Sequence, residues 1–152
     1  MDSEPAKSTI RAWTRLVRAH HRALSGIETA LKQNGFPPLS WYDALLELDR
    51  AGEAGLRPYE LEEKLLLPQY GLSRLLARIE TAGYLTRRPA ADDGRGQVIA
   101  ITESGRDLRV RMWPIYAAAL QTTIGDHLKD DEAVTLAALL ARISEPGSQR
   151  RR

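Results

Sequence analysis

Apolar residues recur every three or four positions in the first part of the chain, starting at Ile10. This period predicts a long amphipathic helix, which the Asn34-Gly35 pair and the two prolines after it should end. Its apolar seam is interrupted at His20 and consists of Ile10, Trp13, Val17, Leu24, Ile27 and Leu31. A seam of this length needs a partner, and a neighbouring subunit is a good candidate.

Two shorter helices are predicted next. Ser40, with Asp43 three residues later, forms a variant of the capping box and indicates the start of a helix that ends at Gly52. The residues expected to be buried in this helix are Trp41, Leu45, Leu46 and Leu48. Pro58 suits the first position of a short helix over residues 59–66, where the missing N–H is not needed.

The helix after that is strongly amphipathic. By the same argument it is predicted to begin at Pro68, and Ala82-Gly83 should end it. Its inward side follows the spacing i, i+3, i+4, i+7 and consists of Leu72, Leu75, Leu76 and Ile79. Its outward side is polar and basic and consists of Gln69, Tyr70, Ser73, Arg74 and Arg78.

The period changes to two after this helix. Residues 84–88 and 97–101 are typical of two strands around a polar tip over residues 91–96. A short helix, an amphipathic helix and a hairpin in this order are the layout of a winged helix-turn-helix, which puts one helix into the DNA major groove and the hairpin beside it. We therefore predict a mainly α fold with a small β-hairpin wing, and sequence-specific DNA binding. A winged helix used for protein contact alone is the alternative.

The rest of the chain is predicted to be helical. Residues 102–105 resemble a cap before a second long helix from Asp107 to about Leu128, which Pro114 should kink. Asp130 and Asp131 suit the N-terminus of a last helix. The apolar stripe of this last helix is expected to be buried and consists of Leu136, Leu139, Leu140 and Ile143.

The formal net charge of +2 conceals an uneven distribution. Residues 34–68 carry 3 positive and 7 negative side chains, whereas residues 69–95 carry 5 positive and 3 negative ones. The sign of the local net charge changes where the amphipathic helix predicted to enter the major groove begins; we call this helix the reading helix.

The composition excludes several classes of protein. With 43% apolar and 28% charged residues, the 152-residue chain is typical of one soluble globular domain. No apolar run approaches the roughly 18 residues of a membrane span, and the N-terminus lacks a signal-peptide pattern, so a cytoplasmic protein is expected. The absence of cysteine excludes disulfides, thiol redox switches and thiolate metal sites. Without a G-x-S-x-G motif, a P-loop or a metal-ligand spacing, neither an enzyme nor a cofactor is expected.

The outward side of the reading helix carries the residue types that contact DNA. Gln pairs bidentately with adenine, Arg with guanine or phosphate, and Tyr or Ser with phosphate or base. In the hairpin the candidates are Arg88, Asp93 and Arg95. An Arg at the tip of a wing can enter the minor groove, and Asp93 would orient that guanidinium rather than bind DNA. A solvated helix face and an ordinary surface hairpin are the alternatives.

Three segments closely resemble the MarR family of bacterial transcriptional regulators. They follow the amphipathic helix in the family's order and read ETAGYL at residues 80–85, DGR at 93–95 and VIAITESG at 98–105. Pro68 and Gly71 stand where the family usually has Ser or Thr, which points to a shifted or frayed start of the reading helix.

The resemblance covers nearly the whole chain and implies an organisation. Residues 1–34 and 103–145 would be dimerisation helices in an intertwined all-helical homodimer scaffold, residues 35–102 the DNA-binding module, and residues 146–152 a disordered tail. The homodimer would bind a pseudo-palindromic operator whose half-sites lie about 34 Å apart. The family typically represses transcription, and a small aromatic or phenolic effector changes the spacing of the two modules.

Five side chains are candidates for an effector pocket, namely Trp13, His20, Trp41, Tyr42 and Tyr116. The implied architecture is expected to bring the aromatic ones toward the cleft between dimer region and DNA-binding module, where they would suit a flat apolar ligand. The alternatives are that these aromatics belong to the core and that His20 is buried and satisfied by a hydrogen bond.

Overall fold

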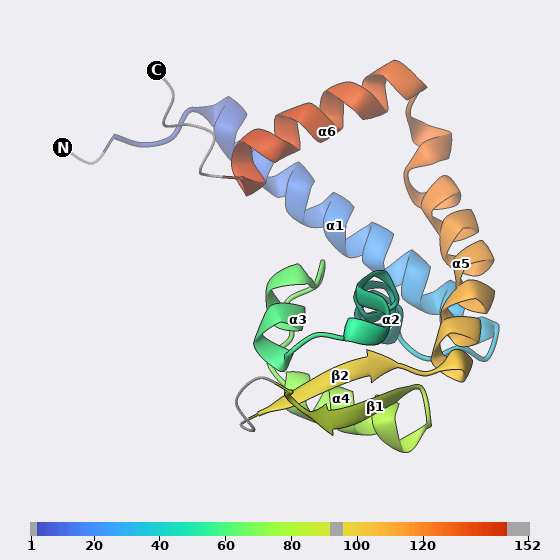
Figure 1. Ribbon diagram of the computed structural model, residues 1–152. Helices are drawn as coiled ribbons and strands as arrows, with labels where there is room; N and C mark the ends of the chain where they lie inside the picture. The colour runs from blue at the N-terminus through green and yellow to red at the C-terminus, as the bar shows by residue number, and fades with distance from the viewer. Residues whose placement is uncertain (1–2, 92–95, 146–152) are drawn as a thin grey trace. The chain divides into compact units, whose positions relative to one another are not determined.

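The computed structural model describes residues 3–91 and 96–145. Their elements are α1 (Lys7–Gln33), α2 (Leu39–Ala51), the short 3-10 helix η1 (Gly52–Ala54), α3 (Pro58–Lys64), α4 (Leu72–Thr81), β1 (Leu85–Pro89), β2 (Gln97–Ile101), α5 (Glu103–Thr123), the 3-10 helix η2 (Gly125–His127) and α6 (Asp130–Ser144) (Figure 1). The predicted fold class, mainly helical with a two-stranded hairpin, is confirmed.

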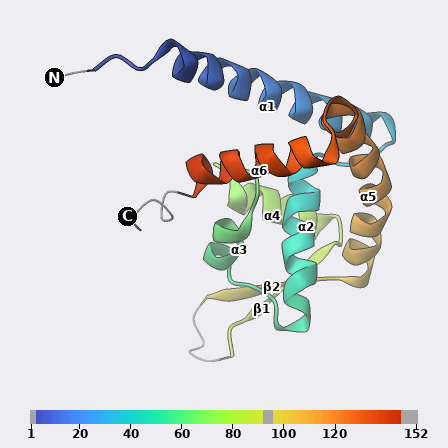
Figure 2. The same ribbon diagram turned by 90° about the horizontal axis from the view of Figure 1, so that it is seen from above.

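The chain divides into two compact units. We call residues 28–116 the winged unit, and residues up to 27 together with those from 117 onward the helical unit. In the winged unit β2 packs against α2, η1 and α3, while α4 packs against β1 (Figures 1 and 2). Its innermost side chains include Leu45, Leu48, Leu61, Leu76, Ile79, Leu85, Ile99 and Met112.

The hairpin is fixed at both of its strands. β1 and β2 pair antiparallel from Leu85 opposite Ile101 to Pro89 opposite Gln97. On its other edge β2 forms a bridge with Leu56, whose N–H donates to the Ile99 carbonyl at 2.8 Å and whose carbonyl accepts the Ile99 N–H at 2.7 Å. The segment between η1 and α3 thus becomes a third partner of the short sheet.

The start of α2 differs from the prediction. The helix begins at Leu39, so Ser40 lies in its first turn and makes no capping hydrogen bond. Instead the Glu28 carboxylate accepts the Leu39 N–H at 2.6 Å from eleven residues away. The predicted capping box at Ser40 and Asp43 is therefore wrong, because an acceptor outside the local sequence satisfies the first free N–H of the helix.

The reading helix also starts later than predicted. α4 begins at Leu72, after Gly71, and residues 65–71 form a loop between α3 and α4. The prediction that Pro68 opens this helix is wrong, and Gln69 and Tyr70 precede it. The inward side agrees better with the prediction, since Leu75, Leu76 and Ile79 are buried.

In the helical unit two expectations about α5 and α6 change. α5 ends at Thr123 rather than near Leu128, and η2 follows it. α6 begins at Asp130 as predicted, but Leu136, Leu139 and Ile143 are exposed, Ile143 by 68%. The predicted burial of this stripe is wrong for the single chain, because no other described part of the chain covers it. None of the described helices has the length and apolar character to cross a membrane.

Candidate nucleic-acid interface

The outward side of α4 carries Ser73, Arg74 and Arg78, and all three side chains are exposed. The opposite side is anchored by buried leucine and isoleucine side chains, so the helix has little freedom to turn about its axis. Neither guanidinium group forms an ion pair or hydrogen bond with another described residue. Two cations are thus held on a rigid helix and remain available to an anionic partner.

The loop before α4 carries the other two residues predicted for this surface. The Tyr70 side chain is fully exposed, and Gln69 is half-buried. The predicted set Gln69, Tyr70, Ser73, Arg74 and Arg78 is therefore split between a loop and a helix, and the three residues on α4 share one helical surface.

The two arginines of β1 are engaged by the protein itself. The Arg88 guanidinium donates from Nη2 to the Glu53 carbonyl at 2.7 Å and to the Ala54 carbonyl at 2.9 Å. Arg87 donates from Nε to the Glu80 carboxylate on α4 at 3.1 Å. These contacts tie β1 to η1 and to α4. The remaining wing candidates, Asp93 and Arg95, lie outside the described residues.

The aromatic candidates lie in different surroundings. Trp41 contacts the Tyr84 ring edge-on with centroids 6.2 Å apart, and lines a hollow of about 460 Å³ with Ala77, Arg78, Thr81 and Ala82. Its neighbour Tyr42 is buried and packs against Tyr116, with centroids 5.1 Å apart, and against Trp113 at 6.2 Å. Sequence reasoning missed Trp113, although its spacing of three residues from Tyr116 on one helix was a usable signal.

Charged and phenolic groups next to this aromatic cluster have shifted pKa values. Burial, with added contributions from Tyr42 and Asp43, raises the pKa of Tyr116 above its usual value, so its hydroxyl stays protonated at neutral pH. Asp49 on α2 pairs with Arg106 at 2.8 Å and with Arg109 at 2.7 Å on α5. Burial alone would raise the pKa of Asp49, but the two guanidinium groups outweigh it and lower that pKa.

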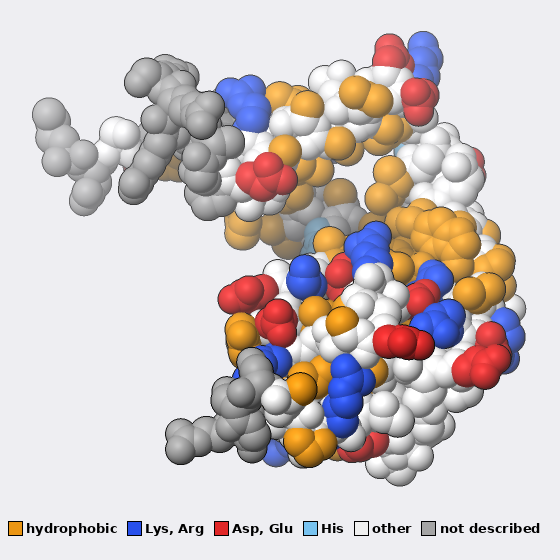
Figure 3. Space-filling view, viewed as in Figure 1, with side chains coloured by type: hydrophobic (Ala, Val, Ile, Leu, Met, Phe, Trp, Pro, Cys, Tyr) orange, Lys and Arg blue, Asp and Glu red, His pale blue; other side chains and the backbone are white. Residues whose placement is uncertain are grey.

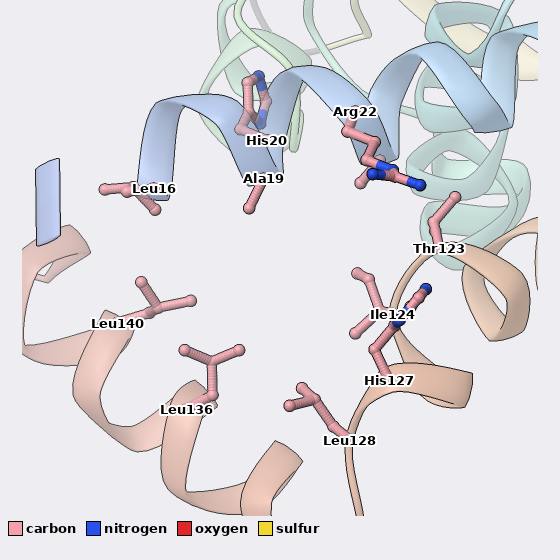
Figure 4. Close-up of a pocket in the computed structure, with 11 residues that line it drawn as sticks. Leu16, Ala19, His20, Arg22, Thr123, Ile124, His127, Leu128, Leu136 and Leu140 are labelled. Carbon is pink, nitrogen blue, oxygen red and sulfur yellow. The ribbon is translucent and has the colours of Figure 1, made fainter. Parts of the chain in front are cut away.

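Trp13 and His20 belong to the helical unit. Both side chains are exposed, so the interpretation of His20 as a buried histidine is wrong for the single chain. His20 and His127 line a hollow of about 490 Å³ whose other walls are largely leucine, isoleucine and alanine side chains of α1, α6 and the segment between α5 and α6 (Figure 4).

A short helix, a loop, an anchored helix with an outward basic side, and a hairpin tied to both form a winged helix-turn-helix module of the DNA-binding type. The sequence profile of the MarR family matches residues 34–96 of the chain. Over these residues the chain matches the MarR family of transcriptional regulators, as its sequence motifs predicted.

Individual proteins are similar to the chain in sequence or in fold. An uncharacterized HTH-type transcriptional regulator of Bacillus cereus is 29% identical over 131 residues, which cover 86% of this chain and 85% of the relative. The crystal structure of Sco3205, a MarR family regulator from Streptomyces coelicolor in complex with DNA, has a similar fold, with a TM-score of 0.85, 22% identity, and 99% of this chain and 94% of the other covered.

A third relative is known in connection with a small molecule. BpsR of Bordetella bronchiseptica, whose DNA binding is regulated by 6-hydroxynicotinic acid, has a TM-score of 0.79 and 19% identity, with 93% of this chain and 98% of BpsR covered. The family consists of transcriptional regulators rather than enzymes, which agrees with the expectation from the motifs.

Proposed function

We propose that this protein is a ligand-responsive repressor that binds a pseudo-palindromic operator as a homodimer, with α4 in the major groove and the wing in the minor groove. The observation that carries the proposal is the pair of exposed arginines, Arg74 and Arg78, on a helix whose other side is buried. Ser73 and, from the preceding loop, Gln69 and Tyr70 complete the proposed contact surface. Arg88, Asp93 and Arg95 are the proposed contacts of the wing.

The helical unit supports the homodimer. Trp13 is 65% exposed on α1, and Ile10 and Val17 of the same seam are exposed as well. Hydrophobic side chains also gather along α6 (Figure 3). Exposed apolar stripes on two long helices are typical of a surface that a second subunit covers. We therefore assign residues 1–34 and 103–145 to dimerisation and residues 35–102 to DNA binding.

The effector site is proposed at the aromatic side chains. The cluster of Tyr42, Trp113 and Tyr116 offers ring edges and faces, and the phenol of Tyr116 stays protonated and so can donate a hydrogen bond to an anionic or phenolic ligand. Trp41 of the same unit is a further candidate, and Trp13 and His20 are candidates within the helical unit. The regulation of BpsR by a small aromatic acid supports this class of ligand.

The DNA-binding part of the proposal is tested by selecting operators from a random duplex pool and measuring affinity against salt. We expect a steep negative slope of affinity with salt concentration. Arg74→Ala should cost about 1–3 kcal/mol of operator binding if Arg74 contacts a base edge. Arg50→Ala is the matched control, because it removes the same charge from an exposed side chain that already pairs with Glu47.

Two results would contradict the proposal. If the parent protein selects no sequence and binds duplex DNA without salt dependence, the module serves protein contact instead. If Arg74→Ala and Arg50→Ala bind the selected operator equally well, the contact surface is wrongly assigned.

The effector part is tested by tryptophan fluorescence during titration with a panel of aromatic acids and phenols. We expect quenching that Trp113→Phe reduces, since Trp113 lies in the aromatic cluster. An absence of response across a broad panel would count against an aromatic effector.

A further inference from the structure

Asp43 is the one buried charged residue among residues 3–91 and 96–145, with 6% of its surface exposed. It lies in the second turn of α2 and takes no part in capping, since Glu28 accepts the first free N–H of the helix. A buried carboxylate is costly unless its oxygens accept hydrogen bonds. Asp43 must therefore have partners elsewhere in the fold.

Both carboxylate oxygens have such a partner in the loop between α3 and α4. Oδ1 accepts the backbone N–H of Leu66 at 3.1 Å, and Oδ2 accepts that of Leu67 at 2.9 Å. These two residues follow the end of α3 at Lys64. The bonds span 23 and 24 residues of sequence, so they are long-range contacts that connect α2 to the approach of the reading helix.

Apolar packing contributes little to holding this loop. The Leu66 side chain is 72% exposed and Leu67 is half-buried. α3 has seven residues and one buried side chain, Leu61, so it too is lightly anchored. The carboxylate of Asp43, itself on a well-buried helix, is therefore a direct restraint on where the loop runs.

We propose that Asp43 is a positioning residue for DNA recognition: by holding the N–H groups of Leu66 and Leu67 it sets the path on which the chain enters α4. The inference rests on the proposed DNA-binding function. Base-edge contacts need side chains within about 0.5 Å of their place, whereas contacts to phosphate tolerate larger shifts. Loosening the loop should therefore affect sequence discrimination more than total DNA affinity.

The test is Asp43→Asn, which keeps the size of the side chain but replaces one acceptor oxygen by an NH2 group that faces a backbone N–H. The readout is the ratio of affinities for the selected operator and for an unrelated duplex. We expect this ratio to fall by about tenfold, within the range that one base contact contributes. The slope of affinity with salt should stay that of the parent, because the number of phosphate contacts is unchanged.

Leu108→Ala is the matched control. Leu108 is buried on α5, and its truncation destabilises the same unit while its side chain makes neither of the two hydrogen bonds that hold the loop. Measured at a temperature where both variants remain folded, Leu108→Ala should keep the parent's discrimination ratio.

Hydrogen exchange supplies a second measurement that does not depend on the variant folding. In the parent, the Leu66 and Leu67 amides should exchange more slowly than that of the exposed Tyr70, which lies three residues after Leu67 in the same loop. Free exchange of both amides in the parent would overturn the inference. The inference would also be overturned if Asp43→Asn had the discrimination ratio of the parent, or if Leu108→Ala lost as much discrimination as Asp43→Asn. If the parent itself shows no sequence discrimination, the proposed function is wrong and this inference falls with it.

Discussion

Replacing Gly55 by alanine tests how the hairpin is fixed to the winged unit. Gly55 has φ +68° and ψ −171°, a backbone conformation that is essentially restricted to glycine. A Cβ atom at this position would lie 2.4 Å from the Ile99 carbonyl oxygen and 2.7 Å from Cγ1 of Val98. The substitution therefore adds backbone strain and a steric clash with β2.

The magnitude follows from these two contributions. A residue with a side chain in this backbone region costs about 1–3 kcal/mol. The clash is relieved when Gly55 moves away from β2, which breaks the two hydrogen bonds between Leu56 and Ile99, each worth about 1 kcal/mol. The sum is about 4 kcal/mol, which lowers the unfolding temperature of a chain of this length by about 10 °C.

Gly52→Ala is the control that separates the two contributions. Gly52 has a similar backbone conformation, φ +63° and ψ −146°, but nothing lies within 4 Å of the position of its Cβ. We expect it to lose only the strain, about 1–3 kcal/mol. Thermal and urea unfolding are compared at one protein concentration, because self-association changes apparent stability. If the two variants lose the same free energy of unfolding, the close contact with β2 is not what requires glycine at position 55.

Three further outcomes are expected. Asp49→Asn should lower the free energy of unfolding at pH 7 by about 1 kcal/mol. Because two arginines of α5 lower the pKa of Asp49, the stability that this carboxylate contributes is fully present above its usual pKa of 3.8 and is lost as the pH falls through the lowered pKa. A difference between parent and variant that stays unchanged in urea unfolding from pH 7 to acid would contradict this pH dependence. Arg88→Ala should cost about 1 kcal/mol of unfolding free energy, since it removes two hydrogen bonds to backbone carbonyls of η1, whereas Arg78→Ala should stay within about 0.5 kcal/mol. Leu139→Glu should weaken dimerisation by about 2 kcal/mol through lost apolar burial in both copies, and sedimentation equilibrium that finds the parent's dimer constant would refute a role of α6 in the interface.

Local signals were sufficient wherever an element depends on its own residues. The period of apolar positions predicted α1, β1 and β2 to within three residues of their observed ends, and Asp130 was predicted as the start of α6. The change from helical to alternating period also predicted the winged helix-turn-helix, and the helical period predicted the exposed basic side of α4. These features follow from the side-chain direction that each backbone conformation imposes, which is a property of neighbouring residues.

Long-range contacts decided the rest. A proline suggested that the reading helix starts at residue 68, yet the loop is held by Asp43 from α2 and the helix starts at Leu72. Neighbours in sequence, Trp41 and Tyr42, contact different aromatic partners, which no local pattern distinguishes.

The apolar stripe of α6 also shows what a local pattern cannot predict. Periodicity correctly marked its residues as apolar on one side of a helix, but it could not say what covers them. Amphipathicity is encoded along the chain, whereas the partner of a helix surface, the acceptor of a free N–H and the guanidinium beside a carboxylate come from residues that meet only after folding.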